Sequence, residues 1–96
     1  MLSMYPLTYS EKRTLYEKQF GRCPGCLEKF ELYRMQVDHI IPKSRFGSDL
    51  SFNLQLLCMS CNLLKGDGNM MELWRKLAEQ KRQEETYRLP RWYNLF

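Results

Sequence analysis

The sequence predicts a small α+β domain, in which a two-stranded antiparallel hairpin and a helix are held together by a four-cysteine metal site and flanked by helices. Three observations predict this class. Two Cys-x-x-Cys pairs bracket the middle of the chain, short strand-like segments lie between them, and helix-capping patterns lie outside them. With 96 residues, we expect one domain over 1–96, with a core at about 23–66 and a C-terminal helix and aromatic tail at about 69–96.

The N-terminal part predicts a capped helix followed by a tight turn. Thr8 and Glu11 have the spacing of a capping box, in which each side chain bonds the other residue's backbone N–H, so a helix is expected over about 9–20. Gly21 is suited to end it, because glycine tolerates the left-handed backbone. The segment 23–26, Cys-Pro-Gly-Cys, then predicts a tight turn.

Two short strands are expected in the middle of the chain. Residues 33–38 alternate between apolar and polar, which indicates a half-buried strand that Pro42 stops. Residues 43–51 show no periodicity and predict a loop. A second short strand is expected at 54–57, antiparallel to the first.

Two further helices are expected after the second cysteine pair. A short one runs through about Lys65, with Leu63 and Leu64 facing the core, until glycines at 66 and 68 break it. Asn69 caps the next helix, and the aromatic tail 87–96 is expected to fold back over the domain. The second helix carries an apolar stripe, interpreted as core: Met70, Leu73, Trp74, Leu77 and Ala78.

The composition indicates which kind of binding partner and which cellular compartment to expect. A formal charge of +4, from 15 Lys+Arg against 11 Asp+Glu, is compatible with a polyanion. Residues 1–10 lack the basic start and apolar run of a signal peptide, and no apolar segment has the length of a membrane span. We therefore expect a cytoplasmic protein with no membrane partner.

The four cysteines predict one structural zinc ion. Each pair forms a turn whose two thiolates converge, and two such turns complete a tetrahedron of sulfur ligands with no open position for substrate. Four thiolates favour zinc. Two disulfides or an iron site are the alternatives, and a reducing compartment disfavours the disulfides. The expected ligands are Cys23, Cys26, Cys58 and Cys61.

A second group of candidate functional residues does not include the cysteines. His39, the only histidine, is suited to take a proton from an attacking water, and the oxygens of Asp38 and Asn62 are suited to Mg²⁺. Neighbouring strand residues point to opposite faces, so the strand must bend or end at His39 if both residues serve one site. A local histidine–aspartate hydrogen bond is the alternative, and spacing alone does not decide between a site and a fold element.

These motifs together resemble the HNH endonuclease family. The resemblance covers residues 23 to about 66 and consists of both cysteine pairs, the D-H-I-x-P strand end, the N-L-Q segment and the C-N-x-x-K helix. The residues that carry it are Asp38-His39-Ile40-Ile41-Pro42, Asn53-Leu54-Gln55-Leu56-Leu57-Cys58 and Cys61-Asn62-Leu63-Leu64-Lys65-Gly66.

The resemblance implies a ββα-metal fold that binds one divalent cation and hydrolyses DNA. It implies that His39 is the general base, that Asp38 and Asn62 hold the cation, and that Asn53 braces the loop and orients the histidine. The third motif letter is Asn62 here, whereas the family's name has His. An amide oxygen is a harder ligand than imidazole, so Mg²⁺ or Mn²⁺ is the expected cation.

The basic residues beside these motifs are candidates for DNA binding. Lys43 and Arg45 lie in the expected loop and Lys65 lies on the helix of Asn62, while a solvated surface charge is the alternative for each. No recognition helix is evident, so specificity is expected to be weak or to come from a homodimer or a partner protein. The alternative functions are a catalytically inactive, zinc-stabilised nucleic-acid-binding module and a zinc-ribbon adaptor for proteins.

Overall fold

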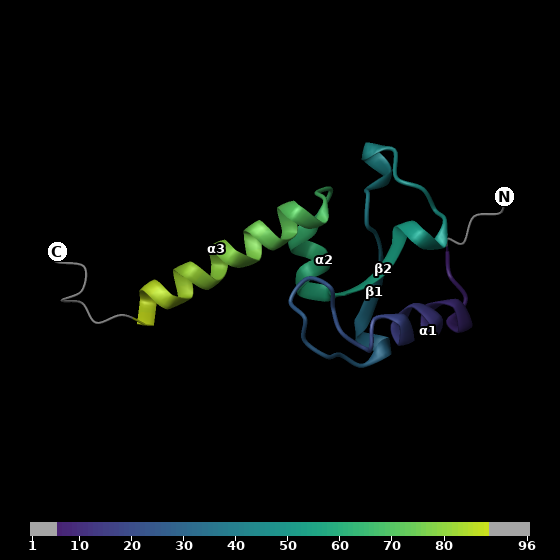
Figure 1. Cartoon of the computed structure of the whole chain (residues 1–96), viewed down its shortest axis with the longest axis horizontal. Coiled ribbons are helices and arrows are strands. Elements are labelled where there is room, and N and C mark those ends of the chain that lie inside the picture. The colour runs from purple at the N-terminus through teal and green to yellow at the C-terminus, as the bar shows by residue number, and fades with distance from the viewer. Residues whose placement is uncertain (1–5, 89–96) are drawn as a thin grey trace.

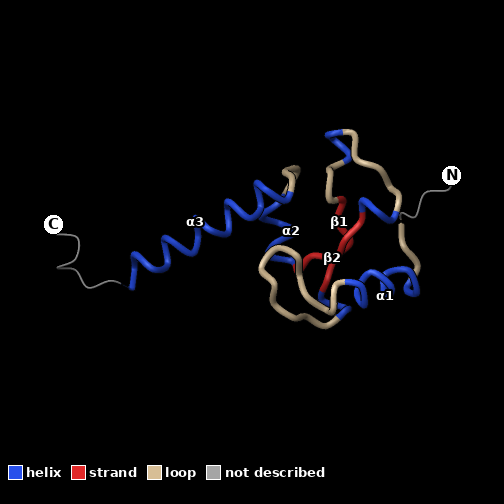
Figure 2. The backbone as a smooth tube through the Cα atoms, viewed as in Figure 1, coloured by secondary structure: helices blue, strands red, loops and turns tan. Residues whose placement is uncertain are grey.

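The computed structural model describes residues 6–88 and contains a two-stranded sheet with a helix directly after it. Strand β1 (Met35–His39) pairs antiparallel with β2 (Leu54–Cys58), and α2 (Met59–Lys65) continues from β2 (Figures 1 and 2). Helices α1 (Tyr9–Lys18) and α3 (Met70–Arg88) flank this unit. The predicted α+β, ββα-metal fold class is therefore confirmed. Within the described part, no helix is both long and apolar enough to span a membrane.

The two strands pair over five residues. Met35 lies opposite Cys58 at one end and His39 lies opposite Leu54 at the other. All five residues of β2 are buried. Helix α1 covers the outer edge of β2, where the Gln19 amide oxygen accepts from Leu56 N at 2.7 Å and its nitrogen donates to Leu56 O at 3.0 Å. One side chain thus satisfies backbone groups that a two-stranded sheet leaves unpaired.

The apolar core is small and includes the cysteines. It lies where α2 and the start of α3 pack beside the sheet, and sulfur atoms form a large part of it. A core of this size supplies limited stability, and small domains often gain the rest from a metal or another crosslink. Its buried members are Cys23, Met35, Leu56, Leu57, Cys58, Cys61 and Leu73.

Helix α1 has the predicted cap. Thr8 Oγ1 accepts from Glu11 N at 3.2 Å, and Glu11 Oε1 accepts from Thr8 N at 3.0 Å. The helix ends at Lys18, slightly earlier than predicted, and both Phe20 and Gly21 have positive φ. The predicted stop is therefore shared by two left-handed residues.

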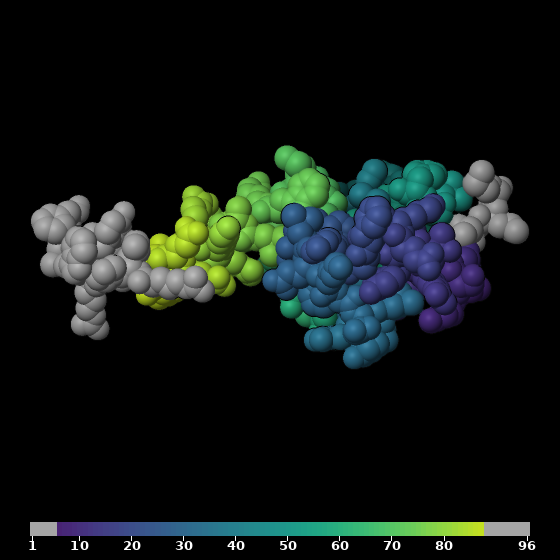
Figure 3. All heavy atoms as spheres, turned by 60° about the horizontal axis from the view of Figure 1, so that its bottom comes forward, coloured from purple at the N-terminus to yellow at the C-terminus, as the bar shows by residue number. Residues whose placement is uncertain are grey.

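Two packing expectations for the later helices are wrong in part, since Leu64, Met70, Leu73 and Leu77 do contribute to the core. Leu63 is 74% exposed, because Cys61, Leu64 and Lys65 form the inner stripe of α2 and Leu63 lies on the opposite side. Trp74 is 46% exposed and Ala78 is also exposed. Only the first turns of α3 contact the body, and the rest extends away as an arm (Figures 1 and 3). The aromatic tail beyond 88 lies outside the described residues.

Candidate active site and metal centre

The four cysteines converge at one end of the hairpin, as the sequence predicted. Their Sγ atoms all lie within 4.8 Å of one another, and all four are free thiols. Four sulfurs at about 2.3 Å from a central ion would lie roughly 3.8 Å apart, so this cluster fits a tetrahedral metal ion with little adjustment. The chain therefore has a four-cysteine site for one metal ion.

The protein environment already favours ionisation of one of these thiols. Burial raises the pKa of Cys23, but hydrogen bonds from the backbone amides of Cys58, Cys26 and Gly25 outweigh it, so the pKa of Cys23 is lowered. Burial raises the pKa of Cys26 and of Cys61, and neighbouring sulfurs add to the effect at Cys61. Four crowded thiols of this kind give up their remaining protons only when a cation compensates the negative charge.

His39 lies at the other end of the same hairpin. Cys58 pairs with Met35 and His39 pairs with Leu54, so four residues of strand, roughly 13 Å, separate the thiols from the histidine. Strand β1 ends at His39 and the chain bends at Ile40 and Ile41. The imidazole is therefore not part of the thiol cluster.

A cavity of about 250 Å³ opens beside the end of β1. Both Asp38 and His39 line it, although consecutive strand residues normally face opposite sides. The strand therefore ends where the sequence argument required, and Asp38 and His39 both lie at one cavity. The lining residues are Val37, Asp38, His39, Pro42, Lys43, Ser44, Lys65, Gly66 and Asp67.

A carboxylate from the loop holds the imidazole. His39 Nε2 lies 2.7 Å from Asp49 Oδ1, and Lys43 Nζ donates to Asp49 Oδ2 at 2.8 Å. The hydrogen bond from Lys43, then that from His39, lowers the pKa of Asp49, so this carboxyl is ionised at neutral pH. An ionised carboxylate only accepts, so Nε2 carries the ring proton and Nδ1 carries the lone pair of a neutral ring. The histidine side chain is 16% exposed.

Asp38 is paired with a buried lysine. Lys65 Nζ lies 3.1 Å from Asp38 Oδ2 and donates to the backbone oxygen of His39 at 2.8 Å. Gln55, the cross-strand neighbour of Asp38, donates to Oδ2 at 3.0 Å. Lys65 is only 1% exposed, so the expected contact between this ammonium and a DNA phosphate does not fit its position. It supports the floor of the cavity instead.

Asn53 braces the loop that begins at the strand end. Its Oδ1 accepts from Ile41 N at 2.8 Å, and its Nδ2 donates to Ile41 O at 3.0 Å and Ser48 O at 2.8 Å. Its backbone oxygen also accepts from Ile40 N. These bonds close the loop between the histidine and Asp49. The bonds to Ile41 and Ser48 brace the loop, while a role of Asn53 in orienting the histidine stays a prediction.

The other predicted residues lie around the cavity without lining it. Asn62 is half-buried, and its Nδ2 donates to Gln36, the residue two before Asp38 on the same strand face. Helix α2 therefore runs beside β1, with Asn62 next to Gln36 and Lys65 next to Asp38. Arg45 forms an ion pair with Glu72 on α3, with its Nη1 2.7 Å from Oε1.

The sequence argument missed three polar residues of this region. Asp49 holds the histidine, Gln55 donates to Asp38, and Asp67 lines the cavity. Gln55 could have been found, because antiparallel pairing of the two strands places it opposite Asp38. Asp49 and Asp67 are in irregular segments, where no periodicity indicates which way a side chain points.

Comparison with known proteins agrees with this geometry. A family model described as HNH endonuclease matches residues 23–68, the segment that contains the hairpin, α2 and all four cysteines. Comparison with curated proteins found no match.

Proposed function

We propose, from the premise that residues 23–68 belong to the HNH endonuclease family, that the chain is a metal-dependent endonuclease that hydrolyses DNA phosphodiester bonds. One observation carries the proposal. His39, held at Nε2 by an ionised Asp49, lines the same cavity as Asp38. A structural histidine needs neither an orienting carboxylate nor an adjacent hollow of this size.

His39 is the proposed general base. As the oxygen of a water forms a bond to phosphorus, a proton of that water passes to Nδ1, and the bond to the leaving sugar oxygen breaks. The ring then carries a positive charge, which the Asp49 carboxylate at 2.7 Å stabilises. Asp49 also fixes the ring's orientation and tautomer, as the carboxylate of a catalytic triad does. Asn53 is proposed to support this arrangement by holding the loop in place.

Asp38 and Asn62 are the proposed ligands of a catalytic cation. The donor chemistry fits, because carboxylate and amide oxygens are hard ligands. Asp38 lines the cavity, whereas Asn62 lies beside it and donates to Gln36, so its amide would have to turn toward Asp38 to bind the same ion. When bound, Mg²⁺ or Mn²⁺ would neutralise charge on the phosphate and on the leaving oxygen. Lys65 already offsets part of the charge of Asp38, which favours weak, exchangeable binding of a single divalent ion.

The four-cysteine site is proposed to hold zinc in a structural role. Its sulfur ligands suit zinc, and all four positions of a tetrahedron are filled by protein. It lies at the end of the hairpin away from His39, so it would stabilise the fold and take no part in the chemistry. Lys43 and Arg45, both well exposed on the turn beside the cavity, are proposed to contact the DNA backbone.

A plasmid assay tests this function. Zinc-loaded protein with Mg²⁺ or Mn²⁺ should nick supercoiled plasmid, and His39→Ala should lower the rate by roughly a hundredfold to ten-thousandfold, the usual contribution of a general base. The variant's zinc content and circular dichroism serve as the control for folding. A wild type that binds plasmid and never cleaves it, with either metal, would support the inactive nucleic-acid-binding module instead.

The form of the cleaved plasmid also indicates the oligomeric state of the protein. One cavity cuts one strand, so a monomer should give open circles, whereas a two-fold dimer should give linear plasmid.

A further inference from the structure

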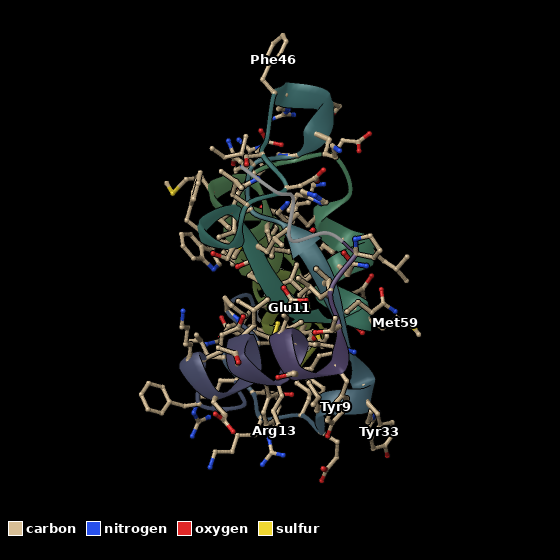
Figure 4. All side chains as sticks on the ribbon, turned by 90° about the vertical axis from the view of Figure 1, so that its right-hand side faces the viewer. Tyr9, Glu11, Arg13, Tyr33, Phe46 and Met59 are labelled. Atoms are coloured by element: carbon tan, nitrogen blue, oxygen red, sulfur yellow. The ribbon has the colours of Figure 1, made fainter. Side chains whose placement is uncertain are left out.

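Phe46 stands fully out of the protein at the tip of the turn that follows Pro42. Its side chain is 100% exposed, the highest fraction among the large hydrophobic residues of 6–88, and it points away from the body of the domain (Figure 4). Single exposed apolar side chains are ordinary on protein surfaces. The turn that carries Phe46, however, has an unusual construction.

The turn is tightly hydrogen-bonded and strained. Arg45 N donates to Pro42 O at 2.8 Å, Phe46 N to Lys43 O at 3.1 Å, and Gly47 N to Pro42 O at 2.9 Å. Phe46 has φ 67° and ψ 25°, a left-handed conformation that is rare for an aromatic residue. A Cβ on Gly47 would lie 1.7 Å from Ile41 O, so only glycine fits after it. Strain of this kind persists only where the surrounding structure enforces it, and it is concentrated at functional sites.

The turn is also anchored at its base. Both terminal nitrogens of the Arg45 guanidinium donate to Glu72 on α3, at 2.7 and 3.4 Å, and this ion pair lowers the pKa of Glu72. On the other side, Lys43 bonds Asp49, which holds His39. The aromatic ring is thus presented on a rigid support.

The same turn forms one wall of the cavity. Pro42, Lys43 and Ser44 line it together with Asp38 and His39, and Phe46 follows two residues later. A DNA strand with a phosphate in the cavity would therefore lie against the turn that carries Phe46. The Lys43 side chain is 59% exposed beside it and carries the charge that attracts such a strand.

We propose that Phe46 is a wedge that inserts between base pairs of duplex DNA, next to the phosphodiester bound at His39. The proposal rests on the nuclease function and adds the way in which the substrate is gripped. An apolar side chain pushed into a base step unstacks it and bends the duplex, which lets more of the backbone reach the protein. A turn with a fixed backbone suits this role better than a mobile one, because little backbone entropy is lost on insertion.

Phe20 provides a matched control. It is also a phenylalanine with positive φ (56°), and it is 82% exposed. It follows α1, three residues before Cys23, and so belongs to the cysteine end of the domain. Figure 4 shows α1 and Phe46 at opposite ends of the molecule. Phe46→Ala and Phe20→Ala thus remove the same group from residues of similar, positive φ at the two ends of the molecule.

The test compares nicking of paired and mismatched duplex oligonucleotides by the full zinc-loaded chain. Phe46→Ala should lower kcat/KM on a fully paired duplex by roughly tenfold to a hundredfold, the range of one lost base–aromatic contact. The decrease in kcat/KM should be much smaller on a duplex that carries a mismatch next to the cleaved bond, where unstacking is already easy. Phe46→Trp should retain activity, and Phe20→Ala should match the wild type on both substrates.

Fluorescence of 2-aminopurine placed beside the cleaved bond gives a second readout. It should rise when the wild type binds without added Mg²⁺ or Mn²⁺, and it should stay unchanged with Phe46→Ala. A wild type that nicks while Phe46→Ala nicks paired duplex equally well refutes the wedge alone. A wild type that binds no duplex refutes the nuclease and the wedge together. Loss of self-association in Phe46→Ala, with nicking unchanged, would make the ring a contact between copies of the chain and also refute the wedge.

Discussion

Replacing Lys65 by methionine separates two roles for this lysine. The sequence suggested a phosphate contact on the helix surface, whereas the structure places the ammonium 1% exposed, 3.1 Å from Asp38. Methionine has a similar length and no charge, so Lys65→Met removes the charge and leaves little cavity. If the lysine is a buried brace, the variant should lose folding stability. If it is a DNA contact, the variant should lose affinity alone.

The expected loss of stability follows from the contacts. Removing one partner of a buried ion pair costs about 3–5 kcal/mol, because the other charge remains buried without compensation. Here Gln55 still donates to Asp38, and the aspartate is close to the cavity, which moves the cost toward the lower limit. The hydrogen bond to His39 O is lost as well, at about 1 kcal/mol. We therefore expect a decrease of about 3–4 kcal/mol in the free energy of unfolding.

Urea unfolding, followed by circular dichroism with saturating zinc and no other divalent ion, measures this decrease. Lys76 is the control, since its ammonium also donates to a backbone oxygen, that of Leu64, from an exposed position. Lys76→Met should change stability by less than about 0.5 kcal/mol. Adding Asp38→Asn to Lys65→Met should cost much less than the sum of the two single changes. A Lys65→Met variant within about 1 kcal/mol of the wild type would refute the buried-brace interpretation.

Three further predictions concern the metal site and the loop. Cys58→Ser should reduce zinc content and unfold the domain, as seen by metal analysis and circular dichroism, because a core this small depends on the ion. Asp49→Ala should lower the nicking kcat by roughly tenfold to a hundredfold, with a smaller loss for Asp49→Asn, whose oxygen can still accept from the imidazole. Asn53→Ala should cost about 2–3 kcal/mol in urea unfolding, because backbone groups of Ile41 and Ser48 lose their partners.

The sequence was sufficient for those features that depend on local pattern. The capping box at Thr8, a strand before the histidine and the two cysteine turns each follow from residues within a few positions of one another. The strand begins at Met35 and not at residue 33, because Leu32–Arg34 form a 3-10 turn, and its burial does not alternate as predicted. The convergence of all four sulfurs also followed, because antiparallel pairing brings the two turns to one end of the hairpin. The bend at the end of β1 was required by chemistry before it was observed.

Features set by tertiary packing could not be read in the same way. A lysine in a C-N-x-x-K helix looks like a surface charge until the helix is placed against β1, which buries it beside Asp38. Leu63 looks like core until the inner side of α2 is known. Asp49 is ten residues from His39 in an irregular loop, and only the closed loop brings the two together. Each of these failed predictions concerns a side chain whose direction depends on an element distant in sequence.

The register of the hairpin links the two ends of the molecule. Shifting β1 by one residue against β2 would turn Asp38 away from α2 and remove it from Lys65 and Gln55. A two-stranded sheet of five pairs resists such a shift weakly on its own. The cysteine cluster fixes one end, because Cys58 is both the last residue of β2 and one of the sulfur ligands. A metal ion there would thus hold the carboxylate and the imidazole in place from roughly 13 Å away, through strand geometry alone.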